Sequence, residues 1–238
     1  MSKFRILVSV VALIAVVATG AFLYVTRDIA APSQSVQAGA QELTPSTNSD
    51  GQVVFRISQD ESKAAFSVSE VLNGSNNLVV GTTNQVAGDI LVNLSNPSAA
   101  QVGEIRINAR TFATDNSRRD NMVARFVLRS EDNANEFITF QPTSTSGLPA
   151  SISVGDTLQF QVTGKLTVAG ASNVATFNVT AALTSQDQLT GHATATISRS
   201  DFSLTIPQVP SVASVEEKLT LTLDFVAKHV SETTANAS

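Results

Sequence analysis

The stretch Leu158–Val168 reads Leu-Gln-Phe-Gln-Val-Thr-Gly-Lys-Leu-Thr-Val. Apolar or small residues alternate with polar ones along it, which is the period of two of a β-strand with one buried face and one face in water. The stretches Val86–Leu94, Phe177–Leu183 and Leu219–Phe225 show the same alternation. The sequence therefore predicts an all-β domain built from antiparallel strands.

Turn signals separate these strands, among them Asn73-Gly74, Asn96-Pro97 and Ser146-Gly147. The pattern gives eight or nine strands, a number that suits either an up-and-down barrel or a sandwich.

One segment departs from the period of two. Between Arg118 and Leu128, Met122 and Phe126 are spaced as on one face of a helix. A side chain of Asp115–Ser117 can cap the start of this helix by accepting a backbone N–H. We predict one short helix that lies over an end of the barrel.

The N-terminus carries an uncharged apolar run from Ile6 to Val25, preceded by Lys3 and Arg5. The run is long enough to cross a bilayer as a helix, and basic residues before it place the rest of the chain outside the cytoplasm. Residues 1–28 are therefore expected to be a transmembrane anchor, which we favour, or a cleaved signal segment. Both predict export to the periplasm or cell surface, and the anchor adds a tether to the cytoplasmic membrane.

The rest of the chain divides by composition. Residues 29–51 are rich in Ser, Gln, Ala, Thr, Asn and Pro without an apolar period, which is typical of a flexible linker. Residues 52–230 carry the strand pattern and form the predicted β-domain, and residues 231–238 are expected to be a disordered tail.

Composition argues against several classes of function. The net charge of −5 and the lack of a basic patch argue against nucleic-acid binding. There is no cysteine, so disulfides, thiol chemistry and cysteine-ligated zinc are excluded. His192 and His229 lie on separate segments, and no G-x-S-x-G motif accompanies them. We therefore expect no catalytic residues, no metal and no cofactor.

Seven segments match a known family in content and order. They are Phe55–Ile57, Ser62–Val68, Val86–Ile90, Thr114–Asp120, Phe137–Phe140, Val162–Gly170 and Ile197–Phe202. In them the chain resembles the YceI-like family of exported, polyisoprenoid-binding, lipocalin-like proteins. The resemblance implies an eight-stranded antiparallel barrel with an elongated apolar cavity, a helix near its mouth, and an isoprenoid lipid such as a quinone or a polyprenyl phosphate as ligand.

On this basis we expect a non-enzymatic protein that binds and sequesters or carries a long-chain isoprenoid lipid outside the cytoplasm. The alternative is a structural or adhesion module with a filled core and no lipid, and a homodimer is left open. The residues expected to bind the ligand are Phe66, Phe112, Arg118, Arg119, Met122, Phe126, Phe140, Phe160, Leu166, Arg199 and Phe202.

The inward arginine has two interpretations. By strand parity, Arg199 falls on the apolar face, where an unpaired charge is costly. It can pair with Asp120 or Asp201 and stabilise the fold. Alternatively Arg118, Arg119 or Arg199 lies at the mouth and binds a phosphate or quinone head group.

Overall fold

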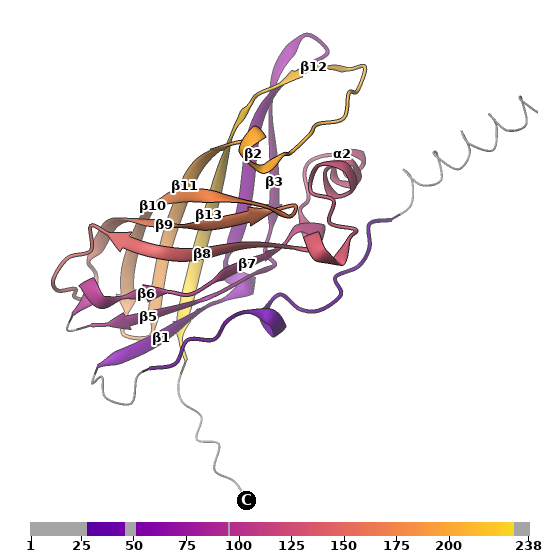
Figure 1. The fold of residues 1–238 in the computed structure, drawn as a ribbon. Helices are drawn as coiled ribbons and strands as arrows, with labels where there is room; N and C mark the ends of the chain where they lie inside the picture. The colour runs from indigo at the N-terminus through magenta and orange to yellow at the C-terminus, as the bar shows by residue number, and fades with distance from the viewer. Residues whose placement is uncertain (1–27, 46–50, 95, 231–238) are drawn as a thin grey trace, which may run out of the picture.

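The computed structural model describes residues 28–45, 51–94 and 96–230, which fold into one curled sheet with a short helix beside it (Figure 1). The strands are β1 Gln52–Ile57, β2 Lys63–Leu72, β3 Ser75–Thr83, β4 Val86–Ala87, β5 Asp89–Asn93, β6 Gln101–Val102, β7 Ile105–Asn108, β8 Phe137–Ser146, β9 Thr157–Val168, β10 Ala171–Ser185, β11 Gln188–Ser198, β12 Val212–Val215 and β13 Lys218–His229. The helix is α2 Ser117–Met122, continued by one wide π-type turn, Val123–Val127. Short 3-10 turns lie at Gln37–Gly39, Gln59–Glu61, Pro97–Ala99, Ala109–Thr111, Asn133–Asn135 and Ser200–Phe202.

The chain connects the two edge regions of the sheet at Gly88. The strand order is β4-β7-β8-β9-β10-β11-β13-β1-β5-β6, so β4 and β5 lie near opposite ends of the order. In the chain, Gly88 alone separates them. A Cβ atom at position 88 would lie 2.6 Å from Cδ1 of Ile105 and 3.1 Å from the carbonyl oxygen of Glu104, so glycine suits this close approach. The sheet therefore curls into a barrel.

One hairpin extends past the barrel. β2 and β3 are joined at Asn73-Gly74, where both residues have positive φ, as the predicted turn requires. The short strand β12 pairs with the outer part of β2, while β13 pairs first with β2 and then with β1. Figure 1 shows the hairpin and β12 at the same end of the molecule as α2.

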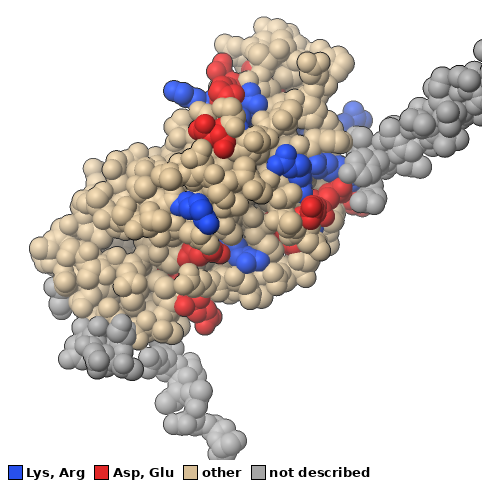
Figure 2. Space-filling view, viewed as in Figure 1, with Lys and Arg blue, Asp and Glu red and all other residues tan. Residues whose placement is uncertain are grey.

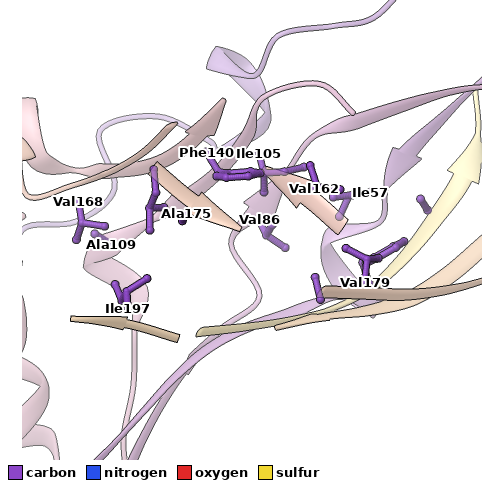
Figure 3. Packing of buried hydrophobic residues seen from close by; sticks show 14 of the residues in the cluster. Ile57, Val86, Ile105, Ala109, Phe140, Val162, Val168, Ala175, Val179 and Ile197 are labelled. Carbon is purple, nitrogen blue, oxygen red and sulfur yellow. The ribbon is translucent and has the colours of Figure 1, made fainter. Parts of the chain in front are cut away.

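The inner face of the sheet is apolar because inward positions alternate with outward ones. On β9, Val162, Leu166 and Val168 are buried, while Gln161 and Lys165 are exposed. Figure 3 shows buried side chains from several strands pointing into the same interior. The predicted all-β antiparallel class and its alternation are confirmed.

The strand count differs from the expected eight. The described residues form 13 strand segments, because short interruptions divide longer strands. Gly88 separates β4 from β5, and the turn Gln59–Glu61 separates β1 from β2.

Two predicted regions lie outside the described residues. These are residues 1–27, with the apolar run expected to be an anchor or signal, and residues 231–238, expected to be a tail. In the part of the chain that the structure describes, no helix is both long and apolar enough to span a membrane.

Residues 28–45, here called the N-terminal strap, run along the outside of the barrel (Figure 1). Val36 is fully buried, and the backbone N–H of Leu43 donates to Oδ2 of Asp89, 3.0 Å away. This differs from the flexible linker expected over residues 29–51. In the described part of that range, backbone groups of the strap bond to side chains of the barrel.

The strongest attachment of the strap is a buried carboxylate, Glu136. Its Oε1 accepts hydrogen bonds from the backbone N–H of Ser33, at 2.8 Å, and from Nδ2 of Asn108, at 3.0 Å. Its Oε2 lies 3.0 Å from Nη1 of Arg110, whose side chain is also buried. Three separate parts of the chain therefore meet at one ionised group.

The surroundings of Glu136 favour its charged form. Burial alone raises the pKa of the carboxyl group, but hydrogen bonds from Ser33 and Asn108 and the charge of Arg110 outweigh burial. The pKa therefore lies below the usual glutamate value. A lowered pKa in the folded state stabilises the protein above the pKa of the unfolded chain, and that contribution is lost as the pH falls through the folded pKa.

We predict that Glu136→Gln lowers the free energy of unfolding by about 3–5 kcal/mol at pH 7, because Arg110 then stays buried without a counter-charge. Urea denaturation followed by circular dichroism measures this loss. The difference between wild type and variant should shrink as the pH falls below about 4.5. Glu61→Gln, which removes an exposed partner of Lys228, is the control and should leave the midpoint nearly unchanged. Equal midpoints for wild type and Glu136→Gln would contradict the account.

Candidate functional site

A cavity of about 600 Å³ occupies the inside of the barrel. This volume is within the range of sites that hold small organic ligands. Its walls are almost entirely apolar and come from most strands of the sheet. Aliphatic and aromatic lining residues include Val68, Ile90, Val92, Phe177, Val179, Ile197, Leu221, Leu223 and Phe225. A filled core would leave no such space.

Aromatic pairs form part of the wall. The rings of Phe66 and Phe112 are 5.4 Å apart, and those of Phe140 and Phe177 are 4.9 Å apart in an edge-to-face arrangement. Phe66 lies against Gly81 on the neighbouring strand, where a Cβ would come within 2.3 Å of the ring. Because residue 81 is glycine, the ring of Phe66 has room to lie against it.

The polar lining residues gather at the α2 end. Of eight polar residues in the wall, six belong to this end: Glu70, Asn116, Arg118, Arg119, Arg199 and Ser211. The exposed lining residues are also found here, namely Asn116, Arg118, Val209 and Ser211. The cavity therefore reaches the surface between α2 and the segment around β12, and we call this opening the mouth. On the face in Figure 2, charged side chains lie from the upper part across the middle to the lower edge and on the right flank, while the left end is nearly free of them.

The helix at the mouth begins as the sequence predicts. The side chain of Asn116 accepts hydrogen bonds from the backbone N–H groups of Arg118 and Arg119, which is a standard helix cap. The guanidinium of Arg119 then bonds to Asp115 and lies 3.3 Å from Oε1 of Glu70. Arg119 therefore links α2 to strand β2 at the mouth through an ion pair with Glu70.

Arg199 is bound by backbone rather than by the expected aspartates. Its Nε donates to the carbonyl of Glu216 at 2.8 Å, and its Nη2 lies 3.4 Å from Oε2 of Glu217. The predicted pairing with Asp120 or Asp201 is wrong. Asp120, in α2, instead accepts hydrogen bonds from Thr114, just before the helix.

Arg118 differs from the other two arginines at the mouth. Its side chain is exposed, lines the cavity, and makes no hydrogen bond or ion pair with other residues of the described chain. Its charge is therefore available to a ligand that enters the mouth.

Nine of the eleven expected site residues line the cavity: Phe66, Phe112, Arg118, Arg119, Met122, Phe140, Phe160, Leu166 and Arg199. The other two do not. Phe126 is 37% exposed, because the wide turn after α2 rotates it away from the barrel. Phe202 is only 1% exposed and packs into the core from a 3-10 turn. Whether the nine contact a ligand stays a prediction.

Sequence reasoning missed Glu70, the one carboxylate in the cavity wall. It is 8% exposed and accepts a hydrogen bond from Nδ2 of Asn77, 2.9 Å away on β3. The alternation of inward and outward residues along β2 was the signal that could have located Glu70. Ala64, Phe66, Val68 and Leu72 on the same strand all line the cavity, and Glu70 continues their alternation.

The site can hold an apolar molecule, and the charged side chains of its wall all lie at the mouth. Among the described residues, no cluster of three His, Cys, Asp or Glu side chains could hold a metal ion. His192 and His229 lie on outer positions, beside Asp224 and Asp187 respectively, and neither lines this cavity.

Solved structures resemble this fold. BcnA from Burkholderia cenocepacia is 19% identical, with a TM-score of 0.58 over 72% of this chain and 99% of its own. A polyisoprenoid-binding domain from Saccharophagus degradans, implicated in plant cell wall breakdown, is 12% identical, with a TM-score of 0.59 over 74% of this chain and 98% of its own. The comparison with curated proteins finds no match.

A family model gives the assignment directly. The model of the YceI-like domain matches residues 55–227, which include every residue that lines the cavity. This match covers well over half of the chain and agrees with the fold likeness to the solved structures. The chain therefore belongs to the YceI-like domain family.

Proposed function

We propose that this protein binds and sequesters or carries a long-chain isoprenoid lipid, a quinone or a polyprenyl phosphate, and that it acts outside the cytoplasm by binding rather than by catalysis. The observation that carries this proposal is the cavity of about 600 Å³, whose walls are almost entirely apolar and whose charged lining residues all lie at its mouth. This distribution matches a ligand with a long hydrocarbon chain and one polar end.

The energetics support an apolar chain as ligand. Each CH₂ group removed from water contributes roughly 0.8 kcal/mol, so ten buried groups contribute about 8 kcal/mol before the cost of ordering the chain. The related domain from S. degradans is described as polyisoprenoid-binding, which supports the same ligand class for this chain. The filled core that an adhesion module would have is not compatible with this cavity.

The head group is proposed to lie at the mouth beside Arg118. Arg119 and Arg199 already bond to groups of the protein, whereas the side chain of Arg118 has no partner in the described chain. A phosphate or a quinone carbonyl can accept its N–H groups.

The export and membrane tether are proposed from sequence. The apolar run from Ile6 to Val25 has the length of a membrane span, and Lys3 and Arg5 favour a cytoplasmic N-terminus. The barrel would then lie outside the cytoplasm, close to a membrane that supplies the ligand.

We predict that Ala193→Phe reduces isoprenoid uptake at least about tenfold while preserving the fold. Ala193 is buried on β11 and lines the cavity between its neighbours on the adjacent strands, Val179 and Leu223, so a ring at this position occupies the space of the ligand. Because it fills a void, the substitution should leave the stability equal or raise it by about 0.5–2 kcal/mol. Uptake is measured by titrating the protein with a fluorescent polyisoprenoid, and stability by urea denaturation.

Thr196→Phe is the matched control. Thr196 lies on the same strand, but its side chain is exposed on the outer face. It should bind the probe as wild type does. Normal uptake by a folded Ala193→Phe variant would contradict binding in the cavity.

We also predict that Arg118→Ala weakens binding of a polyprenyl phosphate by up to about fivefold, equivalent to roughly 1 kcal/mol for an exposed charge pair. Binding of a neutral polyprenol should change less. Lys165→Ala, on the outer face of β9, is the control. Competition titrations at low and physiological salt measure the effect, and equal losses for both ligands would place the head group elsewhere.

A further inference from the structure

We propose that the rim of the mouth docks on the bilayer surface, with the N-terminal strap holding the barrel in that orientation. This inference rests on the proposed function and its membrane tether, and it concerns the direction in which the cavity opens. The surface consists of α2, the turn Val123–Val127 and the exposed residues Val209 and Ser211 at the edge of the cavity.

The strap begins at the base of this rim. Nη2 of Arg125, in the turn that continues α2, donates to the backbone carbonyl of Asp28 at 3.2 Å. In Figure 1 the described chain starts beside the helix α2. The point at which the chain reaches the barrel is therefore next to the mouth.

The short stretch of chain between Val25 and Asp28 limits the distance between the barrel and the bilayer. The apolar run ends at Val25, three residues before Asp28. A fully extended chain spans at most about 3.3–3.6 Å per residue, so the end of the run lies within roughly 10 Å of Asp28. If the run spans the bilayer, the turn Val123–Val127 must lie at or near the membrane surface.

The strap keeps its first residue, Asp28, on the mouth side of the barrel, because further contacts fix the strap to the barrel. Nη1 of Arg110 donates to the carbonyl of Ala31 at 3.0 Å, and the backbone and hydroxyl of Ser33 both donate to the buried Glu136. Farther along, Arg106 donates to the carbonyl of Gly39. A flexible linker over residues 29–51 would let any side of the barrel approach the membrane, whereas the attached strap keeps the mouth side next to the point where the anchor would begin.

Docking of the rim gives the lipid a short path. The mouth is the part of the cavity whose lining is exposed, and it lies on the same side as Asp28. An isoprenoid chain that enters there leaves the bilayer without passing through water, where each CH₂ group would cost roughly 0.8 kcal/mol. The opposite end, at the loop between β8 and β9, would face away from the membrane (Figure 1).

The absence of cysteine allows a direct test with the full chain. Ser117→Cys places one label on the exposed start of α2, and Val154→Cys places one on the β8–β9 loop, where Val154 is 53% exposed. Each variant is labelled with an environment-sensitive fluorophore and reconstituted in vesicles of phosphatidylcholine and phosphatidylglycerol. Quenching by lipids with a nitroxide at the head group is compared with quenching by iodide in the aqueous phase.

We expect the lipid nitroxide to quench the Ser117→Cys label several-fold more than the Val154→Cys label, and iodide to show the reverse order. Insertion of ten Gly and Ser residues between Arg27 and Asp28 should reduce this difference, because the anchor then no longer fixes the distance. Equal quenching of both labels, stronger lipid quenching at Val154→Cys, or no effect of the insertion would overturn the proposal.

Isoprenoid uptake by the same labelled samples distinguishes the docking hypothesis from the proposed binding function. Uptake without a difference between the labels overturns docking and leaves the binding function intact. A difference between the labels without uptake overturns the binding function.

Discussion

A single buried charge connects the parts of this structure. Glu136 is ionised inside the protein because a strap residue, Ser33, and two barrel residues, Asn108 and Arg110, together satisfy its carboxylate. A buried charge that loses one partner costs several kcal/mol, so the strap and the barrel stabilise each other. The strap is thereby part of the folded domain, and its first residue, Asp28, lies beside the turn that continues α2.

In the interior of the barrel, polar and apolar side chains are separated. Inward positions carry aliphatic and aromatic residues of moderate size, and small ones such as Ala193 leave space between the walls. Charge enters the wall only at the mouth, where Glu70 and Arg119 neutralise each other and Arg118 stays available. The barrel therefore offers hydrocarbon solvation along its length and one polar anchoring point at its opening.

The sequence predicted the strands well because the period of two records directly which side chains face the interior. It placed nine of eleven site residues on the cavity wall, and the Asn116 cap at the start of α2. Phe126 was misplaced because helical spacing does not reveal the wide turn after α2. The strap could not be predicted, since many of its bonds use backbone groups that any residue provides. Arg199 bonds to backbone carbonyls and pairs with Glu217, so charge matching pointed to the wrong carboxylates.

The most direct test of a lipid-filled barrel is mass spectrometry of an organic extract from the chain beginning at Asp28, which retains the strap, purified without detergent. The account predicts one isoprenoid lipid per protein molecule, released only when the protein is denatured. An extract without isoprenoid, from folded protein that also fails to take up added quinone or polyprenyl phosphate, would contradict it.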